Sequence, residues 1–454
     1  MDKEVLIKEF STALQINRGV FFVGAGISKP SGFKSWIELL KTMEKDIDIE
    51  IDSNDDLTEI AQYIVNENMG NKGRLLKAIE ENFAVSDSKK INNYHKYLSQ
   101  TNLRTIWTTN YDTMLEKSIN QQVSVKRCDN DLLPSYSGIT GIEIIKMHGC
   151  IESPSPENIV ITKEDYEDYT LNHPLTIERL RSDLINKSFL FIGYSYRDPN
   201  IQNIMNEVRH LCKKKTTPHY IILEEESDKR LNRLQRLWCK DLLRYGINTC
   251  FYKSGEHIEL EQILKEISIK SKGNTIYVTG SHYNNESTLG SELGQELAKI
   301  DEIILLNGQS DGIGKMVLQS FVEYGINNKM DIHNRLRMYA NPYANNVKWD
   351  NDDKYLGELK KFRADLISKT QIIIIFDGGK GTNIEYQLAT ELGSIIIPVI
   401  TDENSSFMND IINNISIIEN IKIYDEAYAE KLNKRKKINV EDIIICVKKI
   451  MNLR

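Results

Sequence analysis

The stretch that decides the fold is GVFFVGAGIS, residues 19–28, in which a short apolar run leads directly into a turn of small residues. A continuous apolar run of this length is typical of a strand buried on both faces, as in a parallel sheet covered by helices. The small residues after it allow a tight turn into a helix, whose free N–H groups can meet the charge of a phosphate. Because glycine also serves turns that bind nothing, this loop alone leaves both uses open.

Similar strand patterns recur along the chain and alternate with segments typical of helices. They lie at residues 19–23, 105–108, 143–147, 190–193 and 219–223 in the first part, and at 275–279, 302–306, 371–376 and 394–400 in the second. Residues 39–83 are rich in helix formers and lack proline, which predicts helices inserted after the first turn. We expect an α/β fold class with two Rossmann-like doubly wound domains, the first with inserted helices. The polar stretch at 269–274 predicts domains at residues 1–272 and 273–454.

Composition excludes several classes of protein. The 454 residues are enough for two or three domains, and the formal charge of -7 lacks the excess of basic residues that nucleic-acid binding needs. The six cysteines, at positions 128, 150, 212, 239, 250 and 446, form no CxxC pair and no zinc-site spacing. No apolar run approaches the roughly 20 residues of a membrane helix. We therefore expect a cytoplasmic protein with no metal, no nucleic-acid partner and no membrane segment.

Polar clusters follow the next three strands predicted after the first one. They are TTNYD at 108–112, KMHG at 146–149 and GYSYRDP at 193–199. Singly, Asn110 or Asp112 could cap a helix and His148 could be a buried structural histidine. However, the carboxyl ends of parallel strands meet at one edge, where ligands of such sheets bind. Together with the first glycine loop, the clusters predict a nucleotide site.

These motifs, in this order over about residues 15–250, resemble the sirtuin family. The resemblance implies that Asn110 and His148 are catalytic, with His148 as the base. It also implies an NAD site, and the residues expected to bind NAD are Gly24, Ala25, Gly26, Ser28, Asp112, Gly193 and Ser195. Tyr194, Tyr196 and Arg197 are candidates for the adenosine side. Residues 161–166, a segment that recurs in sirtuin-like bacterial defence proteins, predict a helix start with Thr162 as its cap.

The departures from the sirtuin pattern change the expected reaction. Thr109 stands where sirtuin deacylases usually have glutamine, the CxxC pairs of their zinc module are missing, and residues 29–36 lack the Pro-Asp-Phe-Arg continuation. Without the zinc module, the groove that presents an acyl-lysine is in doubt. Water then becomes the acceptor of the ADP-ribosyl group, and a histidine can take its proton. We expect an NAD hydrolase rather than a protein deacylase.

A second glycine loop, DGGKGTNIE at 377–385, follows the strand at 371–376. We expect Thr382 to cap a helix that opens at Asn383 and presents N–H groups to an anion, with Lys380 adding charge. With GQSDGIG at 308–314 and TGS at 279–281, the loop resembles the SLOG superfamily, although Asp377 replaces the family's proline. The residues expected to bind a signal nucleotide are Gly280, Ser281, Arg363, Lys380, Gly381, Thr382 and Glu385. Alternatively, Glu385 and Arg363 would serve a phosphoribohydrolase acting on nucleoside monophosphates.

The order of the two domains resembles the effector proteins of Thoeris antiphage systems, over nearly the whole chain. The resemblance implies NAD cleavage to nicotinamide and ADP-ribose, which depletes NAD in antiphage defence. It implies activation by a cyclic ADP-ribose isomer that a Toll/interleukin-receptor-domain protein makes, and a homo-oligomer, expected to be a tetramer. Which isomer activates, the oligomer number, the contribution of cyclisation and the path from the second domain to the NAD site stay open.

Overall fold

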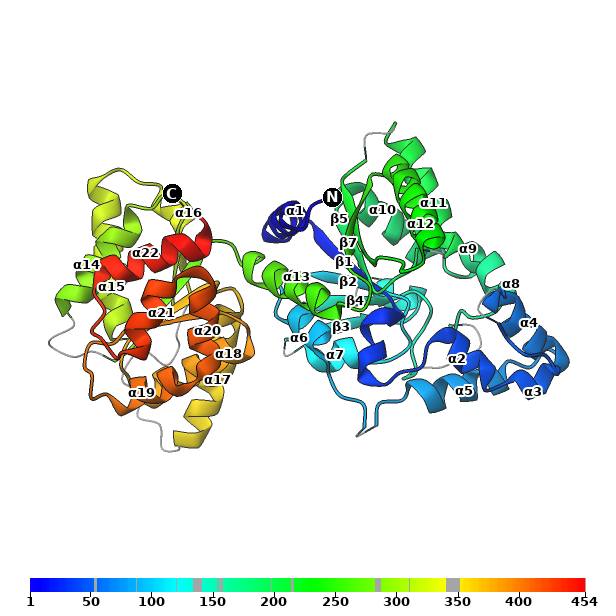
Figure 1. The fold of residues 1–454 in the computed structure, drawn as a ribbon, viewed down its shortest axis with the longest axis horizontal. Helices are drawn as coiled ribbons and strands as arrows, with labels where there is room; N and C mark the ends of the chain where they lie inside the picture. Colours follow the sequence, from blue (N-terminus) through cyan, green and yellow to red (C-terminus); the bar gives the residue numbers. More distant parts are fainter. Residues whose placement is uncertain are drawn as a thin grey trace. The chain divides into compact units, whose positions relative to one another are not determined.

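The computed structural model describes the chain apart from residues 53–54, 87, 120, 134–140, 153–154, 156–157, 197, 214–215, 282–286, 310, 340–351 and 454. The chain divides into two compact units, Met1–Ser271 and Lys272–Arg454. Each unit is built on one parallel β-sheet with helices around it (Figure 1). The expected α/β class with two Rossmann-like folds is confirmed.

In the described part of the first unit, seven strands form a sheet in the order β3-β4-β2-β1-β5-β6-β7. In chain order they are β1 (Gly19–Val23), β2 (Thr105–Thr108), β3 (Val123–Lys126), β4 (Ile142–Lys146), β5 (Ser188–Ile192), β6 (His219–Glu224) and β7 (Ile247–Tyr252). Neighbouring strands of this sheet run parallel to one another. The chain leaves β1 on one side through β2 and returns on the other through β5, so the order of the strands reverses at the centre. A ligand-binding crevice is expected at that point.

Helices cover both faces of this sheet (Figure 1). One face packs against α1 (Lys3–Gln15), α6 (Asn93–Ser99), α7 (Met114–Ser118) and α13 (His257–Lys270), and the other against α10 (Pro174–Asn186), α11 (Pro199–Leu211) and α12 (Lys229–Leu242). Phe21 belongs to the first core and its neighbour Phe22 to the second, because successive side chains of a strand point to opposite faces. Burial on both faces explains why the strand at 19–23 is apolar without alternation.

The predicted helical insertion is present. It comprises α2 (Trp36–Lys41), α3 (Glu44–Ile47), α4 (Leu57–Glu67) and α5 (Gly73–Phe83), which share a separate apolar core. Figure 1 draws them together, close to α8 (Lys163–Glu167), and α9 (Tyr169–Asn172) follows. The predicted cap is also confirmed, because Thr162 and Asp165 form a capping box at the start of α8. An ion pair of 2.6 Å between Lys72 and Asp165 joins the insertion to that cap.

The described part of the second unit has a five-stranded parallel sheet in the order β10-β9-β8-β11-β12. Its strands are β8 (Thr275–Thr279), β9 (Ile304–Asn307), β10 (Leu336–Met338), β11 (Ile372–Ile375) and β12 (Ile395–Pro398). Its helices are α14 (Ser287–Ala298), α15 (Ile313–Asn327), α16 (Ile332–Arg335), α17 (Asp352–Ser368), α18 (Lys380–Glu391), α19 (Ser406–Asn413), α20 (Ile415–Tyr424), α21 (Glu426–Asn433) and α22 (Val440–Met451). Among the described helices of both units, none is long and apolar enough to cross a membrane.

The start of α18 differs from the prediction. The helix begins at Lys380 rather than Asn383, and Gly379 is its N-cap. Thr382 therefore lies in the first turn and is not the cap. Its side chain fills the space beside Gly378, where an added Cβ would come within 2.2 Å of the Thr382 hydroxyl oxygen. The N-terminus of α18 is therefore formed by the backbone of the glycine loop, and no side chain caps it.

Candidate functional site

A cavity of about 380 Å³ lies at the carboxyl edge of the first sheet. It is lined by residues that follow β1, β2, β4 and β5, together with residues of the helical insertion: Ala25, Ser28, Phe33, Lys34, Trp36, Leu39, Thr58, Phe83, Thr109, Asn110, Tyr111, Asp112, His148, Tyr166, Gly193, Tyr194, Ser195, Asp198 and Pro199. The predicted residues Ala25, Ser28, Asn110, Asp112, His148, Gly193 and Ser195 are all in this lining. Four loops from separate parts of the sequence thus meet around one space.

Gly24 and Gly26, which were predicted to bind NAD, lie outside that lining and serve the packing of two loops. The Gly26 N–H donates to the Gly193 carbonyl at 2.9 Å. A Cβ on Gly24 would come within 2.4 Å of the same carbonyl oxygen. Gly193 has φ +58°, and its Cβ would lie 2.6 Å from the Ile27 nitrogen. The glycines therefore let the loops after β1 and β5 touch backbone to backbone beneath the cavity.

The Asn110 side chain is held in one orientation. Its amide nitrogen donates to the Gly24 carbonyl and to the Ser28 hydroxyl, both at 3.2 Å. Its amide oxygen is buried and has no hydrogen-bond partner among the described residues. Since both donor bonds point toward the loop after β1, the oxygen is the end of the amide that stays available to accept a bond.

Lys146 shapes the loop that carries Asn110. Its side chain is fully buried, and its Nζ donates to the backbone carbonyls of Asn110 and Asp112. The same ammonium forms an ion pair of 3.1 Å with Glu116 in α7. One buried cation at the end of β4 therefore fixes the backbone at the end of β2. A neutral glutamine or methionine in its place would leave Glu116 without an ion-pair partner.

His95 is a second neighbour of this site, and the sequence patterns did not single it out. Its Nε2 lies 3.5 Å from the Ser28 hydroxyl, which also accepts from the Asn110 amide. Burial lowers the pKa of His95, and the charge of Asp112 opposes that shift. His95 lies within a helix, α6, and not directly after a strand, so the sequence did not indicate its contact with Ser28.

His148 lies against a carboxylate that the sequence prediction did not name as a site residue. Its Nε2 is 3.0 Å from Oδ2 of Asp198, and the two residues are only 6% and 7% exposed. The ring of Tyr166 packs edge-on against the imidazole, with centroids 5.4 Å apart and an interplanar angle of 81°. Asp198 precedes Pro199 at the start of α11, a position typical of a helix cap. Because capping alone explains an aspartate there, the sequence did not indicate its contact with His148.

Six aromatic side chains line the cavity: Phe33, Trp36, Phe83, Tyr111, Tyr166 and Tyr194. Burial, and then the charge of Asp198, raise the pKa values of Tyr166 and Tyr194 well above the ordinary value, so both phenols are neutral. Of the candidates for the adenosine side, only Tyr194 lines the cavity. Tyr196 is buried in the core against Phe191 and Trp238, and Arg197 lies outside the described residues.

A second cavity of about 220 Å³ lies at the corresponding edge of the second sheet. It is lined by Tyr277, Val278, Thr279, Gly280, Ser281, Asn307, Gly308, Asp311, Gly314, Arg363, Gly379, Gly381, Thr382 and Glu385. Of the predicted residues, Gly280, Ser281, Arg363, Gly381, Thr382 and Glu385 are in this lining. Lys380 is exposed and does not belong to this lining. The positive charge that we predicted for this cavity from Lys380 is therefore absent from its lining.

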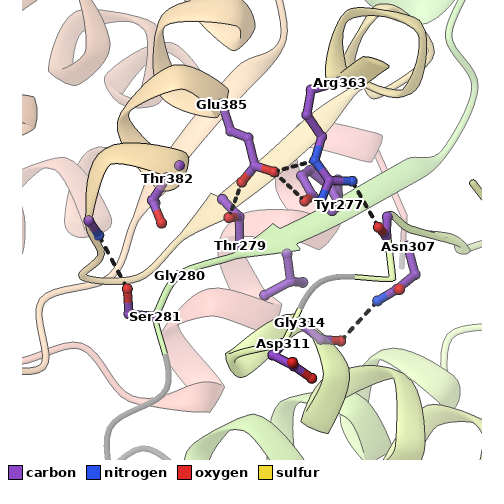
Figure 2. Close-up of a pocket in the computed structure, with 14 residues that line it drawn as sticks. Tyr277, Thr279, Gly280, Ser281, Asn307, Asp311, Gly314, Arg363, Thr382 and Glu385 are labelled. Carbon is purple, nitrogen blue, oxygen red and sulfur yellow. Dashed lines mark hydrogen bonds and ion pairs between the residues drawn. The ribbon is translucent and has the colours of Figure 1, made fainter. Parts of the chain in front are cut away.

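A buried ion pair organises this second cavity (Figure 2). Oε1 of Glu385 lies 2.9 Å from Nε of Arg363 and accepts from the Tyr277 hydroxyl at 2.8 Å, while Oε2 accepts from the Thr279 hydroxyl. Arg363 also donates to the Gly308 carbonyl at 2.9 Å. A Cβ on Gly308 would overlap the guanidinium, which explains the glycine there. The pair thus joins β8, α17, α18 and the loop after β9.

The glycine loop after β11 contributes backbone groups rather than a cation. The Gly379 N–H donates to the Ser281 hydroxyl at 3.2 Å, and the Ser281 N–H donates to the Asp377 carbonyl at 2.8 Å. These two bonds join the loops after β8 and β11 at the start of α18, and Figure 2 shows the one to the Ser281 hydroxyl. The partial positive charge of a helix N-terminus therefore lies at this rim.

Within the described part of the chain, no group of three or more His, Cys, Asp or Glu side chains is arranged to hold a metal ion. All six cysteines are free thiols.

Comparisons with known proteins match both units. The model of the SIR2-like domain matches residues 104–244, and that of the Sir2- and TIR-associating SLOG family matches residues 259–453. The NAD(+) hydrolase ThsA of Cytobacillus dafuensis is 31% identical over 88% of this chain and 85% of its own length. The proteins of the same name from Enterococcus faecium and Bacillus cereus (strain MSX-D12) are each 30% identical, over 97% and 87% of this chain and 96% and 86% of their own lengths. With such identity over more than two thirds of each relative, the chain belongs to the ThsA family of NAD(+) hydrolases.

Proposed function

We propose that this chain cleaves NAD to nicotinamide and ADP-ribose in the first cavity, and that a cyclic ADP-ribose isomer bound in the second cavity activates it. Depletion of NAD would then serve antiphage defence. The relatives are NAD(+) hydrolases by name, which supports NAD as the substrate. The description of the second family model supports a partner with a TIR domain as the source of the signal.

The observation that carries the proposal is a set of buried polar atoms around the first cavity. Oδ1 of Asn110, Nε2 of His148 and Oδ2 of Asp198 are buried, and none has a hydrogen-bond partner in good geometry among the described residues. Leaving such an atom unsatisfied costs about 1–3 kcal/mol. A ribose supplies a hydroxyl that can donate to the Asn110 amide oxygen, and the aromatic side chains of the lining suit a flat nicotinamide ring. NAD brings both groups together.

The reaction follows from these groups. The bond between C1′ of the ribose and N1 of nicotinamide breaks, and its electron pair leaves with the nicotinamide nitrogen. The positive charge on the sugar is stabilised by the Asn110 amide oxygen and the Asp112 carboxylate, both in the cavity lining. A water oxygen bonds to C1′, and its proton passes to His148. The products are nicotinamide, ADP-ribose and one proton.

The structure gives less support to a protein deacylase. Phe33, Trp36, Leu39, Thr58 and Phe83, all from the helical insertion or the segment leading into it, line the first cavity. These side chains fill space that an acyl-lysine would need, whereas water needs little room, which favours hydrolysis.

A phosphoribohydrolase in the second unit is also disfavoured, because both oxygens of Glu385 are engaged. Tyr277, Thr279 and Arg363 together satisfy the carboxylate. A carboxylate paired with a buried guanidinium is a poor base or nucleophile. The same arrangement suits a sensor, because the rigid Arg363 and the N–H groups at the start of α18 can hold phosphates without cleaving the ligand.

The test uses the purified full-length chain and NAD, with cyclic ADP-ribose and its glycosidic isomers added in turn. We expect nicotinamide and ADP-ribose in equal amounts, faster with one isomer. In water enriched in ¹⁸O, the label should enter the C1′ hydroxyl of ADP-ribose. Intact NAD with every isomer, together with deacylation of lysine peptides, would overturn the proposal. Ribose 5-phosphate released from a nucleoside monophosphate, unaffected by His148→Ala, would favour the phosphoribohydrolase.

We also propose that the chain acts as a homo-oligomer, with a tetramer as the expected state. Light scattering after gel filtration measures the mass directly, with and without the activating isomer. A monomer of 52.3 kDa under both conditions would contradict this part of the proposal.

A further inference from the structure

The contact between His148 and Asp198 joins two loops whose strands are not neighbours. His148 follows β4 and Asp198 follows β5, and β2 and β1 lie between those strands in the sheet. Three spacings between strands amount to about 14 Å. Yet Nε2 and Oδ2 lie 3.0 Å apart, because both loops bend over the carboxyl edge toward the cavity. A contact across this distance requires that both loops extend toward each other over the two intervening strands.

The two oxygens of Asp198 have different surroundings. Oδ1 accepts from the backbone N–H groups of Asn200 at 2.9 Å and Ile201 at 3.4 Å, and so caps α11. Oδ2 is buried, faces His148, and has no hydrogen bond in good geometry to any described residue. Capping uses one oxygen only. The other is available to act on the imidazole.

Two described residues near Asp198, Tyr196 and Pro199, support this orientation. Tyr196 has φ +55°, a left-handed conformation that is unusual for a tyrosine. Its ring is buried against Phe191 and Trp238, which stabilises that turn. Pro199 then fixes the first position of α11. Tyr196 and Pro199, the described residues nearest to Asp198 on its two sides, therefore both have restrained backbones.

From this geometry we infer that Asp198 is a positioning residue for His148 in the proposed NAD cleavage, on which the inference rests. The carboxylate accepts the Nε2–H of the neutral imidazole, so that Nδ1 is the nitrogen that takes the proton of water. Its charge then stabilises the imidazolium that forms. Asp198 keeps its own charge throughout. The two atoms are close but not in line in this structure, and a rotation of the ring makes the hydrogen bond, as often happens when a substrate binds.

The test is Asp198→Asn in the full-length chain. Asparagine caps helices as well as aspartate does, so α11 keeps its cap. The substitution removes the negative charge and can place an amide N–H opposite Nε2, which favours the opposite tautomer. We expect kcat for NAD cleavage, with the activating cyclic ADP-ribose isomer present, to fall by about 10- to 100-fold. KM and the melting temperature should change little.

The matched control is Asp228→Asn. Asp228 caps α12 through a bond of 2.8 Å from the Leu231 N–H, is exposed and is not among the residues that line the cavity. This variant should keep the wild-type kcat. Wild-type kcat in Asp198→Asn would overturn the inference, and so would an equal loss in both variants.

Two further measurements separate positioning from a purely structural role. Adding Asp198→Asn to His148→Ala should cause no further loss of kcat, because the aspartate acts through the histidine. An additive loss would overturn the inference. The ¹⁵N chemical shifts of the His148 ring, assigned with His148→Ala, should report the Nε2–H tautomer in the wild type and a shift toward Nδ1–H in Asp198→Asn. An unchanged tautomer would also overturn it, whether or not NAD is cleaved, whereas intact NAD in the wild type with every isomer would overturn the proposed function alone.

Discussion

The two cavities lie at equivalent places in two related sheets but differ in how their polar groups are satisfied. In the first, the amide oxygen of Asn110 and the facing atoms of His148 and Asp198 have no hydrogen-bond partner in good geometry among the described residues. In the second, the carboxylate of Glu385 accepts from Tyr277 and Thr279 and pairs with Arg363. Groups left available suit a reaction, and groups already satisfied suit a rigid binding surface.

The linings differ in the same sense. The first cavity has aromatic side chains in its lining beside its polar groups: Phe33, Trp36, Phe83, Tyr166 and Tyr194. The second is lined mainly by small and polar residues, which bring backbone close to a ligand. One α/β plan therefore supports two uses, and the loops at the strand ends decide between them.

The largest effect should come from His148→Ala, which removes the proposed base from the first cavity. We expect NAD cleavage to fall by about 10²- to 10⁴-fold, because that is the usual contribution of a positioned base. Product formation by liquid chromatography measures it. Binding of the activating isomer should be unchanged in calorimetry, since the second cavity is intact. If the variant cleaves NAD normally, the first cavity is not the catalytic one and the two cavities do not differ in the way we propose.

Next is Arg363→Ala in the second cavity. Removing one partner of a buried ion pair leaves Glu385 uncompensated and costs about 3–5 kcal/mol. We expect a lower melting temperature and loss of the response to the isomer. Lys380→Ala is the matched control: because Lys380 is exposed and lies outside the lining, we expect activation to change by less than about 3-fold. A larger loss in Lys380→Ala than in Arg363→Ala would reverse the assignment.

Gly193→Ala tests the floor of the first cavity. A Cβ there meets the Ile27 backbone nitrogen at 2.6 Å, and φ is +58°. Left-handed strain of about 1–2 kcal/mol and overpacking of about 1–3 kcal/mol both lower the free energy of unfolding. Gly32→Ala has φ +89° but no atom within 4 Å, so only the strain applies. Urea denaturation compares the two, and equal losses would show that the contact between the loops contributes nothing.

The smallest effect should come from Lys272→Met at the start of the second unit. Burial lowers the pKa of Lys272 to about 7, and its Nζ donates to the Leu392 carbonyl at 2.5 Å. Between pH 7 and about 10 the unfolded chain binds the extra proton, so the stability of the wild type rises with pH in that window.

Methionine removes this dependence and should stabilise the second unit by about 1–3 kcal/mol at pH 7. Urea denaturation at several pH values measures it. A wild-type stability that falls between pH 7 and 10 would contradict the assignment of a neutral buried lysine.

Much of the fold was predictable because its strands are buried on both faces. The strands predicted at 19–23, 105–108 and 275–279 coincide with β1, β2 and β8, and the other predicted strands agree within two residues at each end. Three strands were missed: β3, β7 and β10. β3 has four half-buried residues, β7 mixes polar and apolar residues, and β10 has only three residues, so none shows a continuous apolar run.

The candidate sites were predictable where residues lie directly after a strand. Asn110, Asp112 and His148 come together as expected, because parallel strands end at one edge. Lys380 also follows a strand closely, but its direction depends on where α18 begins. A start three residues earlier than predicted leaves the side chain exposed.

The sequence by itself determined the α/β class, the two sheets and the rim on which the polar residues gather, because apolar runs and glycine turns act locally. Only the tertiary structure decided which polar atoms meet. The contact of Asp198 with His148 crosses two intervening strands, and the pairing of Arg363 with Glu385 joins two helices. Such pairs depend on how loops bend and on how side chains far apart in the sequence pack together. Neither property produces a local sequence pattern from which the pair could be predicted.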